Sequence, residues 1–155
     1  MVSPHFPPDA SAATHRVRLL AAHQPSHGWQ PTVLTVDPRD YDSRLDEPLG
    51  ALVPPELEVV RCRALPGRMT RPFGVGDVGL RALPDLWRRA RRLLREDRFD
   101  ALFVSIYPTY PALLGPWLAR ETRAFILDYQ DPWVGAWGLT VGGGQDGRVD
   151  WKSVV

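Results

Sequence analysis

Four short apolar runs alternate with longer polar or helical stretches, and this alternation most limits the folds open to the chain. The runs occupy residues 31–36 (PTVLTV), 57–63 (LEVVRCR), 99–106 (FDALFVSI) and 123–129 (RAFILDY). Continuous apolar runs of this length predict strands that are buried on both faces. Strands that alternate with helices predict a parallel sheet, and right-handed crossovers then favour a Rossmann-like, doubly wound α/β fold.

The stretch ASAATHRVRLLAAHQPSHG is predicted to hold a helix. Val17, Leu20 and Ala21 recur on one face at helical spacing. Pro25 cannot continue the backbone hydrogen bonds, so the helix should end near His23 or Gln24. At the other end, the side chain of Asp9 or Ser11 is expected to cap the first turn.

A second helix is predicted between Asp77 and Asp97. Proline suits a first helical turn better than a helix interior, so the regular part should begin at Pro84 after an irregular lead-in. Trp87 falls in the apolar stripe and should pack in the core. The opposite face carries Arg88, Arg89, Arg91, Arg92, Arg95 and Arg98, and we interpret it first as a solvated face. A short helix is also predicted for residues 111–121.

The size and charge of the chain exclude several classes of protein. Its 155 residues suffice for one domain, and a net charge of +1 gives no electrostatic case for nucleic acid. Cys62 is the single cysteine, so no intrachain disulfide forms and a reducing cytoplasm fits. No apolar stretch approaches the ~20 residues that span a bilayer. The four histidines lack the spacing of a metal site, so no metal is expected.

Both ends of the sequence suggest a fragment of a longer protein. Only Met1, Val2 and Ser3 precede Pro4, so the first strand is expected to be almost missing. Residues 138–155 are glycine-rich and are expected to form a flexible tail. The predicted domain therefore covers residues 1–137.

Three polar or aromatic segments follow the predicted strands directly. They are PHFPPDASAATHR after the first strand, YPTYP after residues 99–106, and DYQDPW after the last strand. Ligands of doubly wound sheets bind at the carboxyl ends of the strands, and a helix amino end there favours anions. GxGxxG and the P-loop pattern are both absent, so no cofactor is predicted. An ordinary strand-to-helix turn remains the competing interpretation of the first segment.

Taken together, PHFPPDASAATHRVRLLAAH, the glycine-bearing turn HGW, PTVLTV and FILDYQDPW resemble the amino-terminal domain of glycosyltransferase family 4. The resemblance covers residues 2–137. It implies a GT-B enzyme in which two Rossmann-like domains face a cleft. The amino-terminal domain would bind the carbohydrate or lipid-linked acceptor, and a carboxy-terminal domain would bind the nucleotide-sugar donor. Transfer would retain anomeric configuration without metal, in the cytoplasm and with peripheral membrane contact left open.

The resemblance also implies which residues border the substrates. The first segment would lie beside the donor diphosphate and the acceptor, the segment after residues 99–106 would form the cleft wall, and the last would form its floor. The implied substrate-binding residues are Phe6, Asp9, Ala10, Ser11, His15, Tyr107, Thr109, Asp128, Asp131 and Trp133. Asp131 has a turn role as an alternative, and Trp133 could instead close the core.

The sequence departs from the family in ways that leave other functions open. The glycine pair common in the first loop is replaced by residues 10–13 (ASAA), which puts close phosphate contact in doubt. No donor domain is present, so the chain alone is expected to be inactive. The alternatives are a non-catalytic α/β fragment or binding module and, less supported without the glycine fingerprint, a nicotinamide-dependent oxidoreductase.

Overall fold

A computed structural model describes residues 1–107 and 110–130. Its strands are β1 (Thr32–Val36), β2 (Glu58–Cys62), β3 (Ala101–Ile106) and β4 (Ala124–Tyr129). β1 pairs with β2 and β3 pairs with β4, both in parallel. Val2 joins the two pairs, because it forms parallel bridges to Leu34 of β1 and Val104 of β3. The order is therefore β2, β1, residues 1–3, β3, β4, which confirms the predicted doubly wound sheet.

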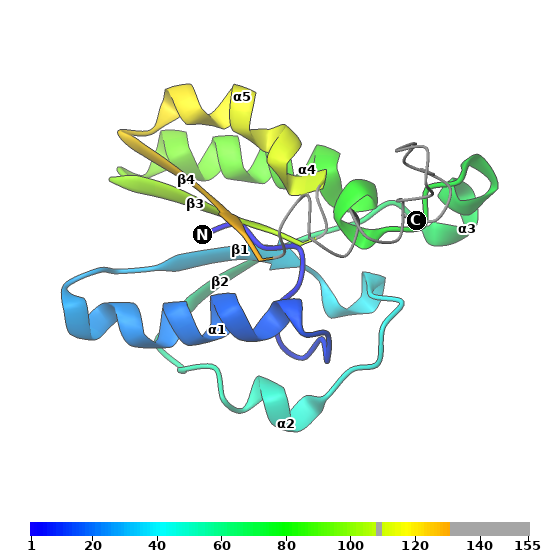
Figure 1. Cartoon of the computed structure of the whole chain (residues 1–155), viewed down its shortest axis with the longest axis horizontal. Helices are drawn as coiled ribbons and strands as arrows, with labels where there is room; N and C mark the ends of the chain where they lie inside the picture. Colours follow the sequence, from blue (N-terminus) through cyan, green and yellow to red (C-terminus); the bar gives the residue numbers. More distant parts are fainter. Residues whose placement is uncertain (108–109, 131–155) are drawn as a thin grey trace, which may run out of the picture.

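Helices cover both faces of this sheet (Figure 1). α1 (Ala13–His23) lies on one side, and α4 (Val78–Glu96) and α5 (Gly115–Leu118) lie on the other. Successive residues of a strand point to opposite faces, and β1 shows this directly. Val33 packs with Phe6 and Val17 on the α1 side, while Leu34 belongs to the larger core under α4.

α1 ends at His23, as Pro25 predicts, but its inner face and its cap differ from expectation. Leu20 is 37% exposed, whereas Thr14 is fully buried, so the buried face of α1 includes Thr14 and excludes Leu20. No side chain caps the helix at Ala12. The predicted cap from Asp9 or Ser11 is wrong because these two residues hydrogen-bond to each other instead.

α4 is one continuous helix, so the prediction that it begins at Pro84 is wrong. The helix starts at Val78, where the Asp77 carboxylate accepts a hydrogen bond of 2.8 Å from the Leu80 backbone N–H. Pro84 lies inside the helix and removes one backbone donor. Trp87 packs against the core as predicted, and the Arg91 guanidinium lies 5.5 Å from the centre of its ring.

The long connections contain short helical segments that sequence patterns did not indicate. They are α2 (Glu47–Gly50), α3 (Gly67–Thr70) and 3-10 turns at Pro38–Asp40 and Arg71–Phe73. The predicted helix at residues 111–121 is instead a 3-10 turn (Tyr110–Leu114), α5 and a second 3-10 turn (Ala119–Glu121). These connections contain little regular secondary structure because prolines and glycines interrupt them.

Arg81 of α4 ties two of these connections together. Its side chain is 2% exposed, and it donates to the backbone carbonyls of Asp40, Leu65 and Gly76 at 3.0, 2.8 and 3.2 Å. It also donates to the Asp42 carboxylate at 2.7 Å. One buried guanidinium therefore satisfies acceptors that the irregular backbone leaves free.

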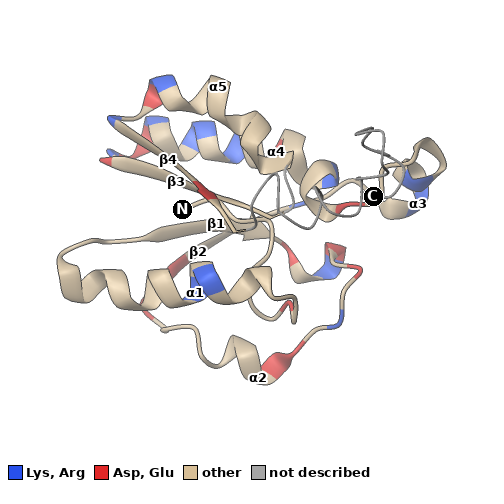
Figure 2. Cartoon of the chain, viewed as in Figure 1, with Lys and Arg blue, Asp and Glu red and all other residues tan. Residues whose placement is uncertain are grey.

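Arg88, Arg89, Arg92 and Arg95 of α4 are exposed, as the sequence predicts, and acidic neighbours pair with them (Figure 2). Arg88 and Arg89 contact Asp85, Arg92 contacts Glu96, and Arg91 and Arg95 contact Glu121. Within residues 1–107 and 110–130, no helix is both long enough and apolar enough to cross a membrane.

Candidate functional site

Three segments meet at the carboxyl edge of the sheet, where the strand order reverses between residues 1–3 and β3. The loop after Ser3 leads into α1, and Tyr107 and Gln130 directly follow β3 and β4. The Gln130 side-chain amide joins them, because its Nε2 donates to Ser105 Oγ at 2.7 Å and to the Ala13 carbonyl at 3.4 Å. This is the edge at which open α/β sheets bind ligands.

Asp9 is the centre of the first loop, between residues 1–3 and α1. Its carboxylate is fully buried and accepts hydrogen bonds from His5 Nδ1 and Ser11 Oγ, each at 2.6 Å. Ser43 Oγ donates to the other oxygen, which also accepts the Ser11 backbone N–H at 3.2 Å. Thr14 Oγ1 adds a longer bond of 3.3 Å. A buried carboxylate with this many donors is an organising group of the loop.

The charge state of Asp9 follows from these contacts. Burial alone would raise the pKa of Asp9, but hydrogen bonds from His5, Ser11 and Ser43 and the charge of His5 outweigh it. The pKa of this carboxyl is therefore held well below its usual range. Asp9 is an anion at any physiological pH.

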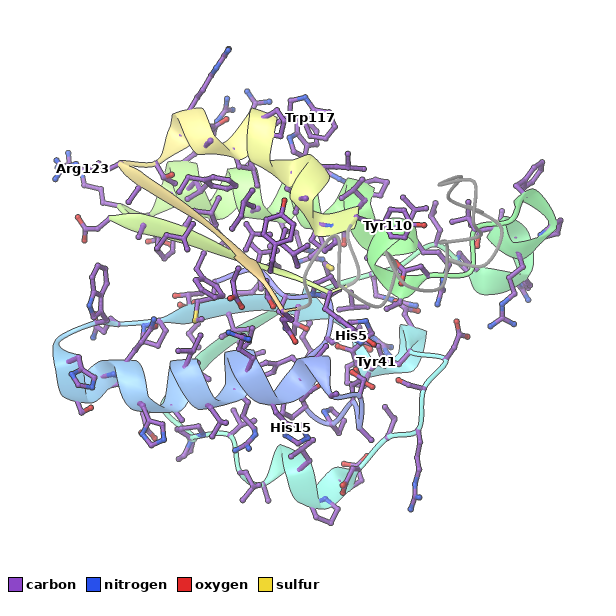
Figure 3. The ribbon with its side chains drawn as sticks, viewed as in Figure 1. His5, His15, Tyr41, Tyr110, Trp117 and Arg123 are labelled. Atoms are coloured by element: carbon purple, nitrogen blue, oxygen red, sulfur yellow. The ribbon has the colours of Figure 1, made fainter. Side chains whose placement is uncertain are left out.

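The His5 imidazole lies between two tyrosine rings. Tyr41 is nearly parallel to it, with ring centres 6.0 Å apart, and Tyr107 meets it edge-on at 6.1 Å. Figure 3 shows His5 and Tyr41 side by side beyond the end of the sheet. The Tyr41 hydroxyl donates to the Pro4 carbonyl at 2.9 Å, and burial raises the pKa of this phenol. Tyr41 therefore holds the loop and the imidazole in one arrangement.

Asp128 of β4 approaches α1 from the opposite side of the switch point. Arg16 Nη1 lies 3.2 Å from Asp128 Oδ1, and this ion pair links the helix to the strand. The other oxygen, Oδ2, is buried and has no hydrogen-bond partner among residues 1–107 and 110–130. An acceptor without a donor at the sheet edge is the kind of group that a ligand can satisfy.

The remaining residues expected from the sequence fall in three different environments. Phe6 is fully buried with Val17, Ala21 and Val33, so it and Asp9 act through the groups that they hold in place. Ala10 is exposed, Ser11 is half-buried, and Tyr107 is 39% exposed beside His5. His15 is exposed, and Figure 3 shows it on the side of α1 away from the sheet and from His5. Thr109, Asp131 and Trp133 lie outside the described residues.

Sequence reasoning missed His5, Tyr41 and Gln130. The i,i+4 pair formed by His5 and Asp9 is a signal that could have been used, since both residues lie in a loop expected at the ligand-binding edge of the sheet. Tyr41 gives no such signal, because it reaches Pro4 across 37 positions of sequence. Gln130 could have been found as the side chain that directly follows β4.

Other features of the described chain point to no second reaction centre. In residues 1–107 and 110–130 no three histidine, cysteine, aspartate or glutamate side chains are grouped to hold a metal ion. Cys62 is buried, and burial raises the pKa of its thiol to about 12, so it is a poor nucleophile. A cavity of about 690 Å³ lies at the amino-terminal edge of the sheet, lined in part by Trp29, Glu58 and Asp100. It is at the far end of the strands from the Asp9 network.

The protein has a Rossmann-like α/β fold, and aromatic, hydroxyl and carboxylate side chains lie together at the carboxyl edge of its sheet, where the strand order reverses. The chain belongs to the glycosyl transferase 4-like domain family, which matches residues 11–153. The match includes α1, the whole sheet after residue 3, and part of the chain beyond β4. No curated protein and no solved structure matches the chain. The chain is thus a glycosyltransferase domain, as its sequence resemblance implied.

Proposed function

We propose that this chain is the acceptor-binding part of a glycosyltransferase that moves a sugar from a nucleotide-sugar donor to a carbohydrate or lipid-linked acceptor. Membership of the glycosyltransferase family supports the reaction class. The observation that carries the acceptor role is the Gln130 bridge, which brings the ends of β3 and β4 to the first turn of α1. Ligands of this sheet topology bind at that place.

The donor would be bound by a second, carboxy-terminal domain that these 155 residues do not include. Transfer would then occur in the cleft between the two domains, without metal and with retention of anomeric configuration. Retention requires that the acceptor hydroxyl and the departing nucleotide share one face of the sugar. A rigid acceptor edge suits this requirement because orientation supplies much of the rate in such a site.

The residues have different parts in this proposal. Ala10 and Ser11 would border the donor phosphate and the acceptor, and Tyr107 and Thr109 would form the wall of the cleft. His15 faces away from this edge of the sheet and has no part in it. Asp128, Asp131 and Trp133 form the floor of the cleft, where Trp133 would stack on a sugar ring. Phe6 and Asp9 shape the first loop from beneath.

The enzyme would work in the cytoplasm, where nucleotide sugars are the donors, and its arginine-bearing α4 would face an acidic membrane. Arg88 and Arg92 are 71% and 75% exposed, which supports such a contact. Their pairing with Asp85 and Glu96 weakens the net field, so any membrane contact would be peripheral.

The test is sugar transfer by the complete enzyme that contains this chain together with its donor domain. UDP-glucose, GDP-mannose and ADP-glucose would be offered in turn, with release of nucleoside diphosphate and the anomeric proton signal of the product as readouts. We expect transfer from one donor, and none from the 155-residue chain alone. Failure of the complete enzyme with every donor, while its fold is intact, would favour a non-catalytic binding module.

One variant tests the proposed floor of the cleft. Asp131→Asn in the complete enzyme should lower turnover at least tenfold while the melting temperature stays within a few degrees, because the change removes a charge without changing shape. Equal losses of activity and of thermal stability would instead assign Asp131 a structural role in the turn before Pro132.

A further inference from the structure

The two nitrogens of the His5 imidazole have different environments. Nδ1 lies 2.6 Å from Asp9 Oδ2, where Asp9 has no exposed side-chain surface. Nε2 makes no hydrogen bond within residues 1–107 and 110–130. It is not one of the buried polar atoms that lack a partner there, so Nε2 is accessible at the surface. The ring as a whole is 12% exposed. One nitrogen is therefore anchored inside the domain, and the other is left at its surface.

Asp9 determines which nitrogen carries the hydrogen. A carboxylate can only accept hydrogen bonds, so the contact at 2.6 Å requires a hydrogen on Nδ1. In the neutral imidazole this leaves the lone pair on Nε2. Asp9 is stabilised as an anion by Ser11 and Ser43 as well, so it does not depend on a positively charged imidazole.

The direction of that lone pair is also fixed. Tyr41 stacks on one side of the ring and Tyr107 closes its edge, so the imidazole cannot rotate without displacing a neighbour. Tyr107 follows β3, on the other side of the strand-order reversal from the first loop. His5 Nε2 is thus an oriented acceptor placed at the ligand-binding edge of the sheet.

We propose that His5 Nε2 accepts a hydrogen bond from a hydroxyl group of the sugar acceptor, and that Asp9 is the positioning residue that holds the hydrogen of the neutral imidazole on Nδ1. The inference rests on the proposed function and adds a specificity-determining residue to it. Both residues precede the part of the chain that the family matches, which begins at residue 11. An acceptor oriented in this way favours hydroxyl-bearing ligands over analogues that lack the hydroxyl.

His5→Asn in the complete enzyme separates the two nitrogens. The asparagine amide can still donate to Asp9 in place of Nδ1, but it supplies nothing in place of Nε2. We expect the acceptor KM to rise about tenfold, the effect of one lost hydrogen bond, with the donor KM and the melting temperature unchanged. His27→Asn is the matched control, because His27 is exposed and lies outside this site; it should change none of these quantities.

Asp9→Asn tests the positioning role. The Ser11 backbone N–H can only donate, so the oxygen of the new amide must face it and the NH₂ group must face His5. The imidazole then has to accept at Nδ1, which moves its hydrogen to Nε2. ¹⁵N NMR of labelled histidine should show Nδ1–H in the wild type and Nε2–H in Asp9→Asn, together with a rise in acceptor KM similar to that of His5→Asn.

The outcomes separate this inference from the proposed function. A wild-type enzyme that transfers sugar, combined with an unchanged acceptor KM in His5→Asn, overturns the role of His5 alone. A wild-type Nε2–H signal overturns the role of Asp9. A complete enzyme that transfers no sugar from any donor overturns both the inference and the function on which it rests.

Discussion

Asp9 and Arg81 are both buried charged side chains, yet their partners are of different kinds. Arg81 donates to three backbone carbonyls and one carboxylate, and each of its nitrogens has at least one acceptor. Asp9 accepts hydrogen bonds from the hydroxyl groups of two serines and from the imidazole of His5. The Arg81 network leaves no nitrogen of the guanidinium without an acceptor. The Asp9 network leads to His5 Nε2, an acceptor at the surface that makes no hydrogen bond within residues 1–107 and 110–130.

The difference distinguishes a buried charge that only stabilises the fold from one that also prepares a ligand-binding side chain. A charge that satisfies free backbone acceptors holds loops in place and has no atom left for a ligand. A charge that orients a side chain with an unused acceptor prepares that side chain for a ligand, as second-layer carboxylates do for catalytic or metal-bound histidines. The Arg81 network should therefore affect stability alone, whereas the Asp9 network should affect both stability and recognition.

The largest expected effect is that of Arg81→Met on stability. The substitution keeps an apolar side chain of similar length but leaves the carbonyls of Asp40, Leu65 and Gly76 without a donor. We expect the free energy of unfolding to fall by about 4 kcal/mol, as for other buried charges whose partners remain. Urea unfolding followed by circular dichroism measures this quantity.

Arg89→Met is the matched control, because Arg89 is 44% exposed and, within the described part of the chain, pairs only with Asp85 on the same helix. It should cost less than about 1 kcal/mol. Similar losses in both variants would contradict the structural role of Arg81.

The next effect is a loss of stability in acid that depends on Asp9. The pKa of Asp9 in the folded chain is depressed well below its usual range. Its contribution is therefore fully present above about pH 4, the pKa of an unfolded aspartate, and is lost as the pH falls toward the folded pKa. The expected slope is about 1.4 kcal/mol per pH unit below pH 4.

Asp9→Asn should be less stable than the wild type at neutral pH, and the difference should shrink as the pH falls. Asp37, Asp40 and Asp85 also have lowered pKa values, so the wild type alone cannot assign the slope to one residue. Urea midpoints of the two proteins between pH 2 and 7 give the comparison. Parallel curves would show that Asp9 gains no stability from being charged.

Sequence patterns predicted the sheet well because its signals are local. Each strand is a run of adjacent apolar residues, and the alternation with helices determines the parallel order through the handedness of crossovers. The same patterns misplaced the start of α4, since the Asp77 cap and the buried Arg81 outweigh the local preference of Pro84. Tertiary contacts commonly override propensity in this way.

The site could be located from the sequence but not assembled. Topology places the three segments that hold Asp9, Tyr107 and Asp128 at the carboxyl edge of the sheet, and that location follows from the order of the strands alone. Strand order does not predict which side chains contact one another. The stacking of Tyr41 on His5, the bond from Gln130 to Ser105 and the pairing of Arg16 with Asp128 all join residues distant in sequence.

The smallest expected effect distinguishes the ends of the two networks. Asp42 is 49% exposed and shares its carboxylate between Arg81 and the exposed Arg71, so Asp42→Asn removes a charge that water already screens. Arg81 keeps its three carbonyl acceptors, and the loss should stay below about 1 kcal/mol. Ser43→Ala, by contrast, removes a donor from the fully buried Asp9 and should cost about 1 kcal/mol or more. Thermal unfolding of both variants decides the order. If Asp42→Asn were the more damaging change, the Arg81 network would depend on its surface carboxylate and would resemble the Asp9 network after all.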